Sequence, residues 1–304
     1  MAARYTELVV PLLLNKKRVV GIVDTGSNIT LLHQSMIGDA ADPANDRPFS
    51  VDFARTVERR VAFMSGVGVS RDAVADIRTE AGNTPLEAGA VVTIVDLHET
   101  IQNFPQEVDM IVGTNALASK VVKFEAGRPP EVLTRAGFRA LQKSEAGMLE
   151  IDTVGTMCDL PRDSLGPLFM VRVHNAEVPG TVFLADTGNK FSSFCLENQK
   201  RAETDRVNAA VCGVGLECFA CGETNAQIGV RGRSELGFRP MTIRQKLQKI
   251  PPPESLTSIE AWCRDENGER IDIQGNLGID FWAGLMRLTV FDFHKRKIFC
   301  VPSK

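Results

Sequence analysis

The fold is decided by two short stretches of sequence, Ile22-Val23-Asp24-Thr25-Gly26-Ser27 and Leu184-Ala185-Asp186-Thr187-Gly188-Asn189. In each stretch an apolar run ends at an aspartate that Thr and Gly follow. Gly permits a close approach of two backbones, and the Thr hydroxyl can bond to backbone groups across an interface. Each stretch therefore predicts a tight turn that mounts one carboxylate rigidly.

The two stretches belong to an internal duplication. Each aspartate follows the second strand of a predicted hairpin. In the first half the strands are Leu8–Leu14 and Arg18–Val23, with a turn at 15–17. In the second half they are Phe169–His174 and Pro179–Ala185, with a turn at 175–177. A motif of apolar residues and Gly follows each aspartate at nearly the same distance, in Met110–Asn115 and in Asn276–Phe281. We therefore predict two halves of one plan, an N-terminal domain over 1–155 and a C-terminal domain over 156–304, with their boundary between Glu125 and Pro167.

Composition limits the classes of protein to consider. The chain has 304 residues, 43% hydrophobic and 24% charged, which predicts a globular protein with substantial cores. Its net charge of -3 is spread in both signs, so nucleic acid is excluded as a partner. No apolar run reaches the roughly 18 residues that a membrane helix needs. The N-terminus lacks a secretory pattern, so we expect a cytoplasmic protein unless a leader precedes this sequence, and the compartment stays open.

Short β-branched runs that end at Gly, Asn, Asp or Pro dominate the chain and predict a mostly-β fold. The clearest predicted strands are Thr6–Leu14, Arg18–Val23, Ala90–Leu97, Met170–His174 and Leu288–Phe293. Helical periodicity is sparse, and it predicts helices over Pro130–Lys143 and Thr242–Lys249.

The chemistry of the two turns depends on their meeting. If they face each other across a pseudo-two-fold axis, like-charge repulsion makes Asp24 and Asp186 share one proton, and the pair titrates as a unit. Such a dyad can activate a water molecule and polarise a carbonyl, which hydrolyses a peptide bond without a covalent intermediate. The acid and base roles belong to the pair jointly, and the reaction needs neither a metal nor a cofactor.

These motifs, together with a closing segment over Asn276–Trp282, Thr289–Phe293 and Lys297–Pro302, resemble the pepsin-like aspartic proteases. The resemblance implies a bilobal fold, with two orthogonally packed β lobes and a central cleft that holds an extended peptide or protein substrate. It also implies a hairpin flap with Ser65, Gly66, Val67 and Gly68 at its tip. Because one chain carries both motifs, we expect a monomer.

The same resemblance suggests roles around the dyad. Thr25, Gly26, Thr187 and Gly188 would fix the carboxylates, and Ser27 and Asn189 would be outer hydrogen-bond partners. Three departures from the family pattern are visible. Ser65 stands where a flap tyrosine is usual, Asn189 replaces a Ser or Thr, and no basic prosegment precedes the first strand. The first two departures, at Ser65 and Asn189, motivate an alternative, a protease-like protein that binds peptides or proteins with weak or no turnover.

The other reactive residues suggest weaker hypotheses. All seven cysteines lie in the second half, and Cys212, Cys218 and Cys221 allow a metal or redox loop, although a local disulfide or free thiols is the simpler interpretation. One or two disulfides are possible. The histidines, His33, His98, His174 and His294, follow no motif that pairs them with a nucleophilic Ser or Cys. Trp262 and Trp282 are interpreted as core or interface aromatics.

Overall fold

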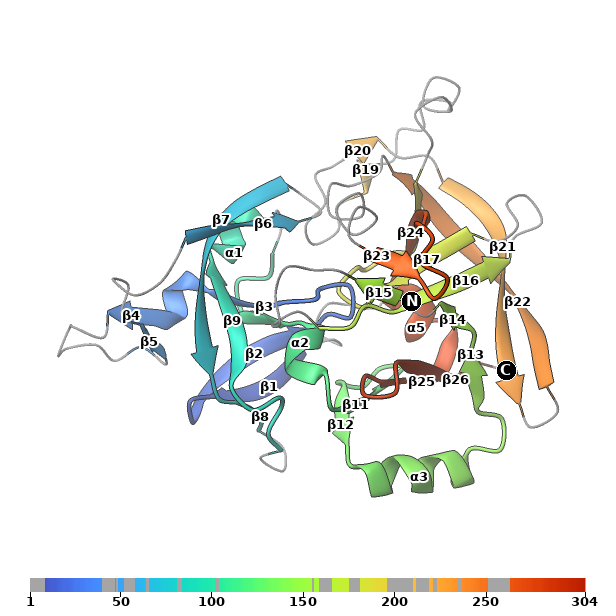
Figure 1. The fold of residues 1–304 in the computed structure, drawn as a ribbon, viewed down its shortest axis with the longest axis horizontal. Coiled ribbons are helices and arrows are strands. Elements are labelled where there is room, and N and C mark those ends of the chain that lie inside the picture. The colour runs from blue at the N-terminus through green and yellow to red at the C-terminus, as the bar shows by residue number, and fades with distance from the viewer. Residues whose placement is uncertain are drawn as a thin grey trace.

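The computed structural model describes residues 9–39, 47, 49–51, 58–63, 66–80, 84–101, 104–154, 156–158, 166–174, 181–195, 210–211, 219–220, 223–234, 237–250 and 263–303. Within them strands far outnumber helices, which confirms the prediction of a mostly-β protein. Two large sheets carry most of the strands (Figure 1).

An eight-stranded sheet is built from the first part of the chain and lies on the left of Figure 1 in blue to teal. In spatial order its strands are β6 (Glu58–Phe63), β7 (Gly66–Ala75), β9 (Ala90–Val95), β3 (Thr30–His33), β10 (Met110–Val112), β2 (Lys17–Val23), β1 (Val9–Leu14) and β8 (Ile77–Thr79). A two-residue turn at Asn15 and Lys16, with φ values of 49° and 73°, joins β1 to β2. Positive φ at both positions is the geometry that hairpins favour because it matches the twist of the strands.

A twelve-stranded sheet takes up the rest of the chain. In spatial order its strands are β12 (Glu131–Leu133), β11 (Val121–Glu125), β25 (Met286–Asp292), β26 (Lys297–Pro302), β13 (Leu149–Ile151), β21 (Glu223–Ser234), β22 (Gly237–Ile250), β18 (Ser193–Cys195), β24 (Ile273–Leu277), β17 (Thr181–Ala185), β16 (Met170–His174) and β14 (Thr153–Val154). The sheet therefore includes strands from both sides of residue 155, and the division of domains at that residue stays a prediction.

The remaining elements are short. Three pairs of strands stand apart from the large sheets, β4 (Ile37–Asp39) with β5 (Phe49–Val51), β15 (Thr156–Cys158) with β23 (Cys263–Asp265), and β19 (Ala210–Val211) with β20 (Phe219–Ala220). The helices are η2 (Gln34–Met36), α1 (Leu97–Thr100), α2 (Thr114–Leu117), α3 (Arg135–Ser144) and α5 (Ile279–Trp282). Among the described residues no helix combines the length and apolar character needed to cross a bilayer.

The same four-strand pattern occurs in both large sheets. In the first, β2 pairs antiparallel with β1 and parallel with β10, which pairs antiparallel with β3. In the second, β17 pairs antiparallel with β16 and parallel with β24, which pairs antiparallel with β18. Gly113 and Gly278 end the corresponding strands β10 and β24, and each precedes a one-turn helix. The predicted hairpins and Gly motifs thus occupy equivalent places.

One of the two predicted helices is wrong. Thr242–Lys249 lies within the strand β22, which pairs with β21 from Glu223 opposite Gln248 to Ser234 opposite Gly237. Ile243 and Leu247 have a helical spacing, but Met241, Ile243 and Leu247 also fit an alternation of apolar and polar residues. Pairing along β21 selects the strand.

The other predicted helix exists in a shorter form. It begins at Arg135, because Glu131–Leu133 pairs with β11 as β12. The Thr134 hydroxyl then accepts a hydrogen bond of 3.0 Å from the Gly137 N–H and caps the helix.

An aromatic cluster holds the centre of the core together. Phe291 lies in edge-to-face contact with Phe124, Phe169 and Trp282, at ring-centroid distances of 5.5, 5.2 and 5.4 Å. Phe293 stacks on Phe291 at 6.1 Å, and all five rings are fully buried. Trp282 is therefore a core residue, as predicted, whereas Trp262 lies outside the described residues.

We expect Phe291→Ala to lower the free energy of unfolding by about 3–5 kcal/mol, because it removes the ring on which the others pack and leaves a cavity. Equilibrium unfolding in guanidinium chloride measures the change. Val74→Ala is the control, because Val74 is 66% exposed and its truncation should change stability by less than about 0.5 kcal/mol. A small effect of Phe291→Ala on the free energy of unfolding would show that the other rings repack into the space without loss of stability.

Candidate active site

The aspartates of the two turns occupy equivalent backbone positions. The Asp24 N–H donates to the Val112 carbonyl at 3.0 Å, and the Asp186 N–H donates to the Leu277 carbonyl at 2.9 Å. Each aspartate therefore lies just beyond a parallel strand pair, β2 with β10 or β17 with β24. The loops that follow are held in matching fashion by bonds of 2.8 Å, from Thr114 N–H to Ser27 O and from Ile279 N–H to Asn189 O.

Four hydrogen bonds between Thr25 and Thr187 and their surroundings lock the turns together. The Thr25 N–H donates to Thr187 Oγ1 at 3.0 Å, and the Thr187 N–H donates to Thr25 Oγ1 at 3.0 Å. Each hydroxyl then donates across the interface, Thr25 to the Ala185 carbonyl at 2.8 Å and Thr187 to the Val23 carbonyl at 2.9 Å. Both threonines are completely buried, so the two turns form one unit.

Glycine follows each threonine because a carboxyl group occupies the space of a side chain. A Cβ atom on Gly26 would lie 2.4 Å from Asp186 Cγ, and one on Gly188 would lie 2.2 Å from Asp24 Cγ. Each carboxyl group therefore lies over the backbone of the opposite turn. A hydrogen bond also links the two carboxyl groups to each other. The structure thus brings together Asp24, Asp186, both threonines and both glycines, as the sequence predicts.

The two predicted outer partners act through their backbones. The Gly26 N–H donates to Asp24 Oδ1 at 2.8 Å, and the Ser27 backbone N–H also bonds to Asp24. The Ser27 hydroxyl instead donates to the Ile29 carbonyl at 2.7 Å. The Asn189 N–H donates to Asp186 Oδ1 at 3.1 Å, whereas its buried side-chain Oδ1 has no hydrogen-bond partner.

Sequence reasoning missed one side chain that contacts the pair. Asn276 on β24 is completely buried, and its Nδ2 donates to Asp186 Oδ2 at 3.2 Å. Its Oδ1 accepts from the backbone N–H of Ser193 at 3.1 Å and from the Ser193 hydroxyl. The signal in the sequence is an asparagine at a strand position where the first half has Ile111.

The surroundings favour the protonated forms of both acids. Burial raises the pKa of Asp24 above its usual 3.8, although bonds from backbone N–H groups oppose the change. Burial, and then repulsion from Asp24, raise the pKa of Asp186 well above 3.8. The hydrogen bond between the carboxyl groups lowers the pKa of Asp24 and raises that of Asp186.

The predicted flap lies on a hairpin. β6 and β7 pair antiparallel up to Phe63 opposite Gly66, so Gly66, Val67 and Gly68 lie on the strand β7. Ser65 lies outside the described residues.

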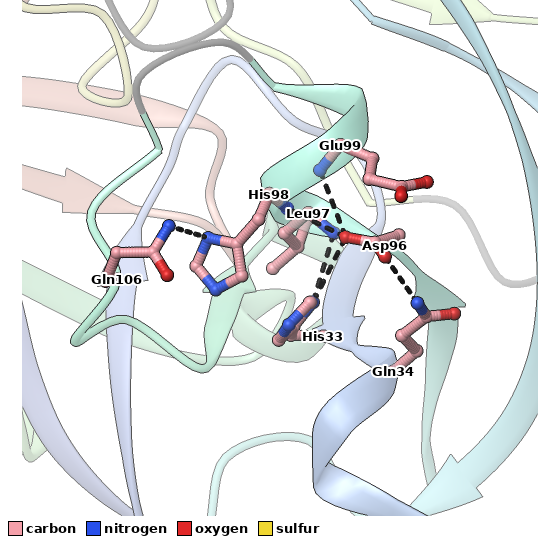
Figure 2. A network of polar contacts seen from close by, with 7 residues as sticks. All are labelled: His33, Gln34, Asp96, Leu97, His98, Glu99 and Gln106. Atoms are coloured by element: carbon pink, nitrogen blue, oxygen red, sulfur yellow. Dashed lines mark hydrogen bonds and ion pairs between the residues drawn. The ribbon is translucent and has the colours of Figure 1, made fainter.

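A separate polar network surrounds Asp96 (Figure 2). Asp96 Oδ1 accepts from the N–H groups of His98 and Glu99 at 3.1 and 3.0 Å, which caps α1. His33 Nδ1 accepts from the Leu97 N–H at 3.2 Å, and the rings of His33 and His98 meet edge to face with centroids 4.2 Å apart. Burial and the neighbouring His98 lower the pKa of His33.

This network lines a cavity of about 910 Å³ at the far end of β3. Its wall includes His33, Asp96, His98, Arg47 and Arg71. His33 is the last of the four residues of β3 and lies three residues beyond Thr30, the end near the aspartate turn, which is about 10 Å along the strand. The cavity is therefore separate from the site of Asp24 and Asp186, and neither aspartate lines it.

The structure describes two cysteine side chains, those of Cys263 and Cys300, and neither is a reactive thiol. Burial raises the pKa of the free Cys300 thiol to about 12, which keeps it protonated at neutral pH. Cys263 is disulfide-bonded and lies opposite Cys158 in the register of β15 and β23. Cys212, Cys218 and Cys221 lie outside the described residues. Within those residues, no three His, Cys, Asp or Glu side chains form a group that could hold a metal ion.

No protein-family model matches the sequence, and no curated protein matches it either.

We expect Thr187→Val to lower the free energy of unfolding by about 2–4 kcal/mol, because it leaves the buried Thr25 N–H without its acceptor and the Val23 carbonyl without its donor. Denaturant unfolding measures the loss. Thr187→Ser keeps the hydroxyl and should retain most of the stability. A Thr187→Val protein as stable as the parent, with the loss confined to Thr187→Ser, would indicate that packing of the methyl group, and not the hydrogen bonds, holds the turns together.

The raised pKa of Asp186 predicts a pH-dependent stability. Because the native state binds this proton more tightly than the unfolded chain, the contribution of Asp186 is complete below its usual pKa of 3.8 and is lost as the pH rises through the native value. Asp186→Asn should therefore melt about 2–4 °C above the parent at pH 8, which corresponds to about 1 kcal/mol, and lose this advantage near pH 4. Calorimetry across this range tests the sign, and a difference that is constant with pH contradicts it.

Proposed function

We propose that the chain is an aspartic endopeptidase with Asp24 and Asp186 as its catalytic dyad. One observation carries the proposal: two Asp-Thr-Gly turns from distant parts of the chain are cross-linked by the buried hydroxyls of Thr25 and Thr187, with the carboxyl groups bonded to each other. A structural ion pair does not explain two adjacent acids, since each raises the cost of ionising the other. Two acids that share a proton suit acid–base hydrolysis.

The roles within the dyad follow from where the proton resides. We assign it to Asp186, because burial and the neighbouring Asp24 raise the pKa of Asp186 well above its usual value, and Asp24 is then the ionised member of the pair. Asp24 then removes a proton from an attacking water molecule, while Asp186 gives its proton to the carbonyl oxygen of the scissile peptide bond. In the second step Asp24 passes its proton to the leaving nitrogen, the C–N bond breaks, and Asp186 recovers its proton from the collapsing diol. No covalent intermediate forms.

We further propose the bilobal pepsin-like arrangement, with one lobe based on the eight-stranded sheet and the other on the twelve-stranded sheet. The repeated four-strand pattern and the central position of the paired turns support it. The hairpin of β6 and β7 is the element that would cover an extended peptide in the cleft, whose main chain would bond in the manner of an added strand.

The proposal predicts that the purified chain cleaves a denatured protein or a peptide library between about pH 3 and pH 7. Asp24→Asn and Asp186→Asn should each lower kcat/KM by about 10³-fold or more, because each removes an ionisable member of the dyad. Mass spectrometry of the products measures cleavage. Asp272→Asn, the same exchange at an exposed aspartate, is the control and should keep the parental rate.

Two results would contradict the proposal. Cleavage that survives both dyad variants would point to another centre or to a contaminating protease. No cleavage at any pH, together with tight binding of peptides, would favour the protease-like binding protein instead.

A further inference from the structure

The two halves match closely around the aspartates. In the first half, the Thr30 hydroxyl donates to Asn115 Oδ1 at 2.7 Å and accepts from the Gly113 N–H at 3.1 Å. In the second half, the Ser192 hydroxyl donates to Asp280 Oδ1 at 2.7 Å and accepts from the Gly278 N–H at 3.0 Å. This polar network behind each turn is therefore kept in both copies.

One cross-strand pair breaks the match. Leu31 lies opposite Ile111 where β3 pairs with β10, and both are buried in the apolar core. At the equivalent place, where β18 pairs with β24, Ser193 lies opposite Asn276. Two neighbouring apolar residues in one copy thus correspond to two hydrogen-bonded polar residues in the other.

The orientation of the Asn276 amide is determined by Ser193. Its Oδ1 accepts from both the backbone N–H and the hydroxyl of Ser193, so the amide nitrogen must be the end that faces Asp186 Oδ2. Ser193 is 2% exposed and Asn276 is completely buried, so water does not compete for these bonds. An amide fixed in this way donates in one direction only.

We propose that Asn276, oriented by Ser193, is a positioning residue for Asp186: it fixes the plane of that carboxyl group and stabilises its ionised form. This inference rests on the proposed function and deepens it. Asn189 bonds to Asp186 through its backbone N–H, and Asn276 supplies a side-chain donor from a different strand. Because ionised Asp186 is the product of each proton transfer to substrate, the same bond makes Asp186 a better acid. Asp24 receives no corresponding bond, because Ile111 has no donor.

The test replaces Asn276 with leucine, which has a similar shape and no donor, together with Ser193→Ala, so that no Ser193 hydroxyl is left unpaired. A donor lost from a buried carboxylate raises its pKa, so we expect the alkaline limb of the kcat/KM profile to move up by about one pH unit. At the pH optimum kcat should fall about tenfold with little change in KM, since Asp186 becomes a weaker acid. Ile111→Val, at the symmetry-related position, is the control and should keep the parental profile.

A second readout does not depend on activity. In protein labelled with ¹³C at the aspartate side chains, the Asp186 signal is assigned by its loss in Asp186→Asn and is titrated directly. It should titrate about one unit higher in the double variant. If that variant does not fold, Asn276→Ser, which is too short to reach Asp186, replaces it and should shift the titration in the same direction.

The outcomes separate the two proposals. A raised Asp186 titration in a protein that cleaves nothing supports the role of Asn276 and overturns the peptidase. Cleavage with an unchanged or lowered Asp186 titration in the variant overturns the role of Asn276 and leaves the peptidase standing.

Discussion

The structure depends on the exchange of hydrogen bonds between Thr25 and Thr187. Each threonine presents a buried backbone N–H that its own turn cannot satisfy, and the hydroxyl of the other threonine is the acceptor. An unpaired buried N–H costs about 1–3 kcal/mol, so each turn is complete only when the other is present. A Thr hydroxyl suits this task because it accepts one bond and donates another, here to the Ala185 or Val23 carbonyl.

That constraint forces the rest of the local structure. With the turns locked, the carboxyl groups of Asp24 and Asp186 each lie over the opposite glycine, where even a methyl group would collide with them. Two carboxyl groups confined in this way cannot both ionise at low cost, so one proton stays between them. The scaffold thus holds in place a pair of acids that would separate in water, and their chemistry is a consequence of the hydrogen bonds behind them.

Repetition made much of this site predictable. Asp24, Asp186 and the Thr-Gly pairs stand out because the sequence around them occurs twice, and a repeat shows which positions the geometry requires. Thr242–Lys249 was predicted wrongly because a spacing of four residues fits both a helix turn and a strand with alternating faces, and the pairing with the preceding strand β21 that decides between them cannot be read from that spacing. Asn276 was missed for the opposite reason: its importance lies in a difference between the copies, which a search for similarity passes over.

This difference bears on how a symmetric scaffold can do asymmetric chemistry. Hydrolysis needs one carboxyl group to give a proton while the other takes one, yet a strictly two-fold arrangement would make Asp24 and Asp186 equal. The networks of Thr30 with Asn115 and of Ser192 with Asp280 leave that symmetry intact, because they brace the loops and do not bond to either carboxyl group. Asn276 does bond to one carboxyl group and has no polar equivalent beside the other. Asn276 therefore adds a side-chain difference to the unequal backbone bonds of the two acids, since several N–H groups bond to Asp24 and that of Asn189 bonds to Asp186.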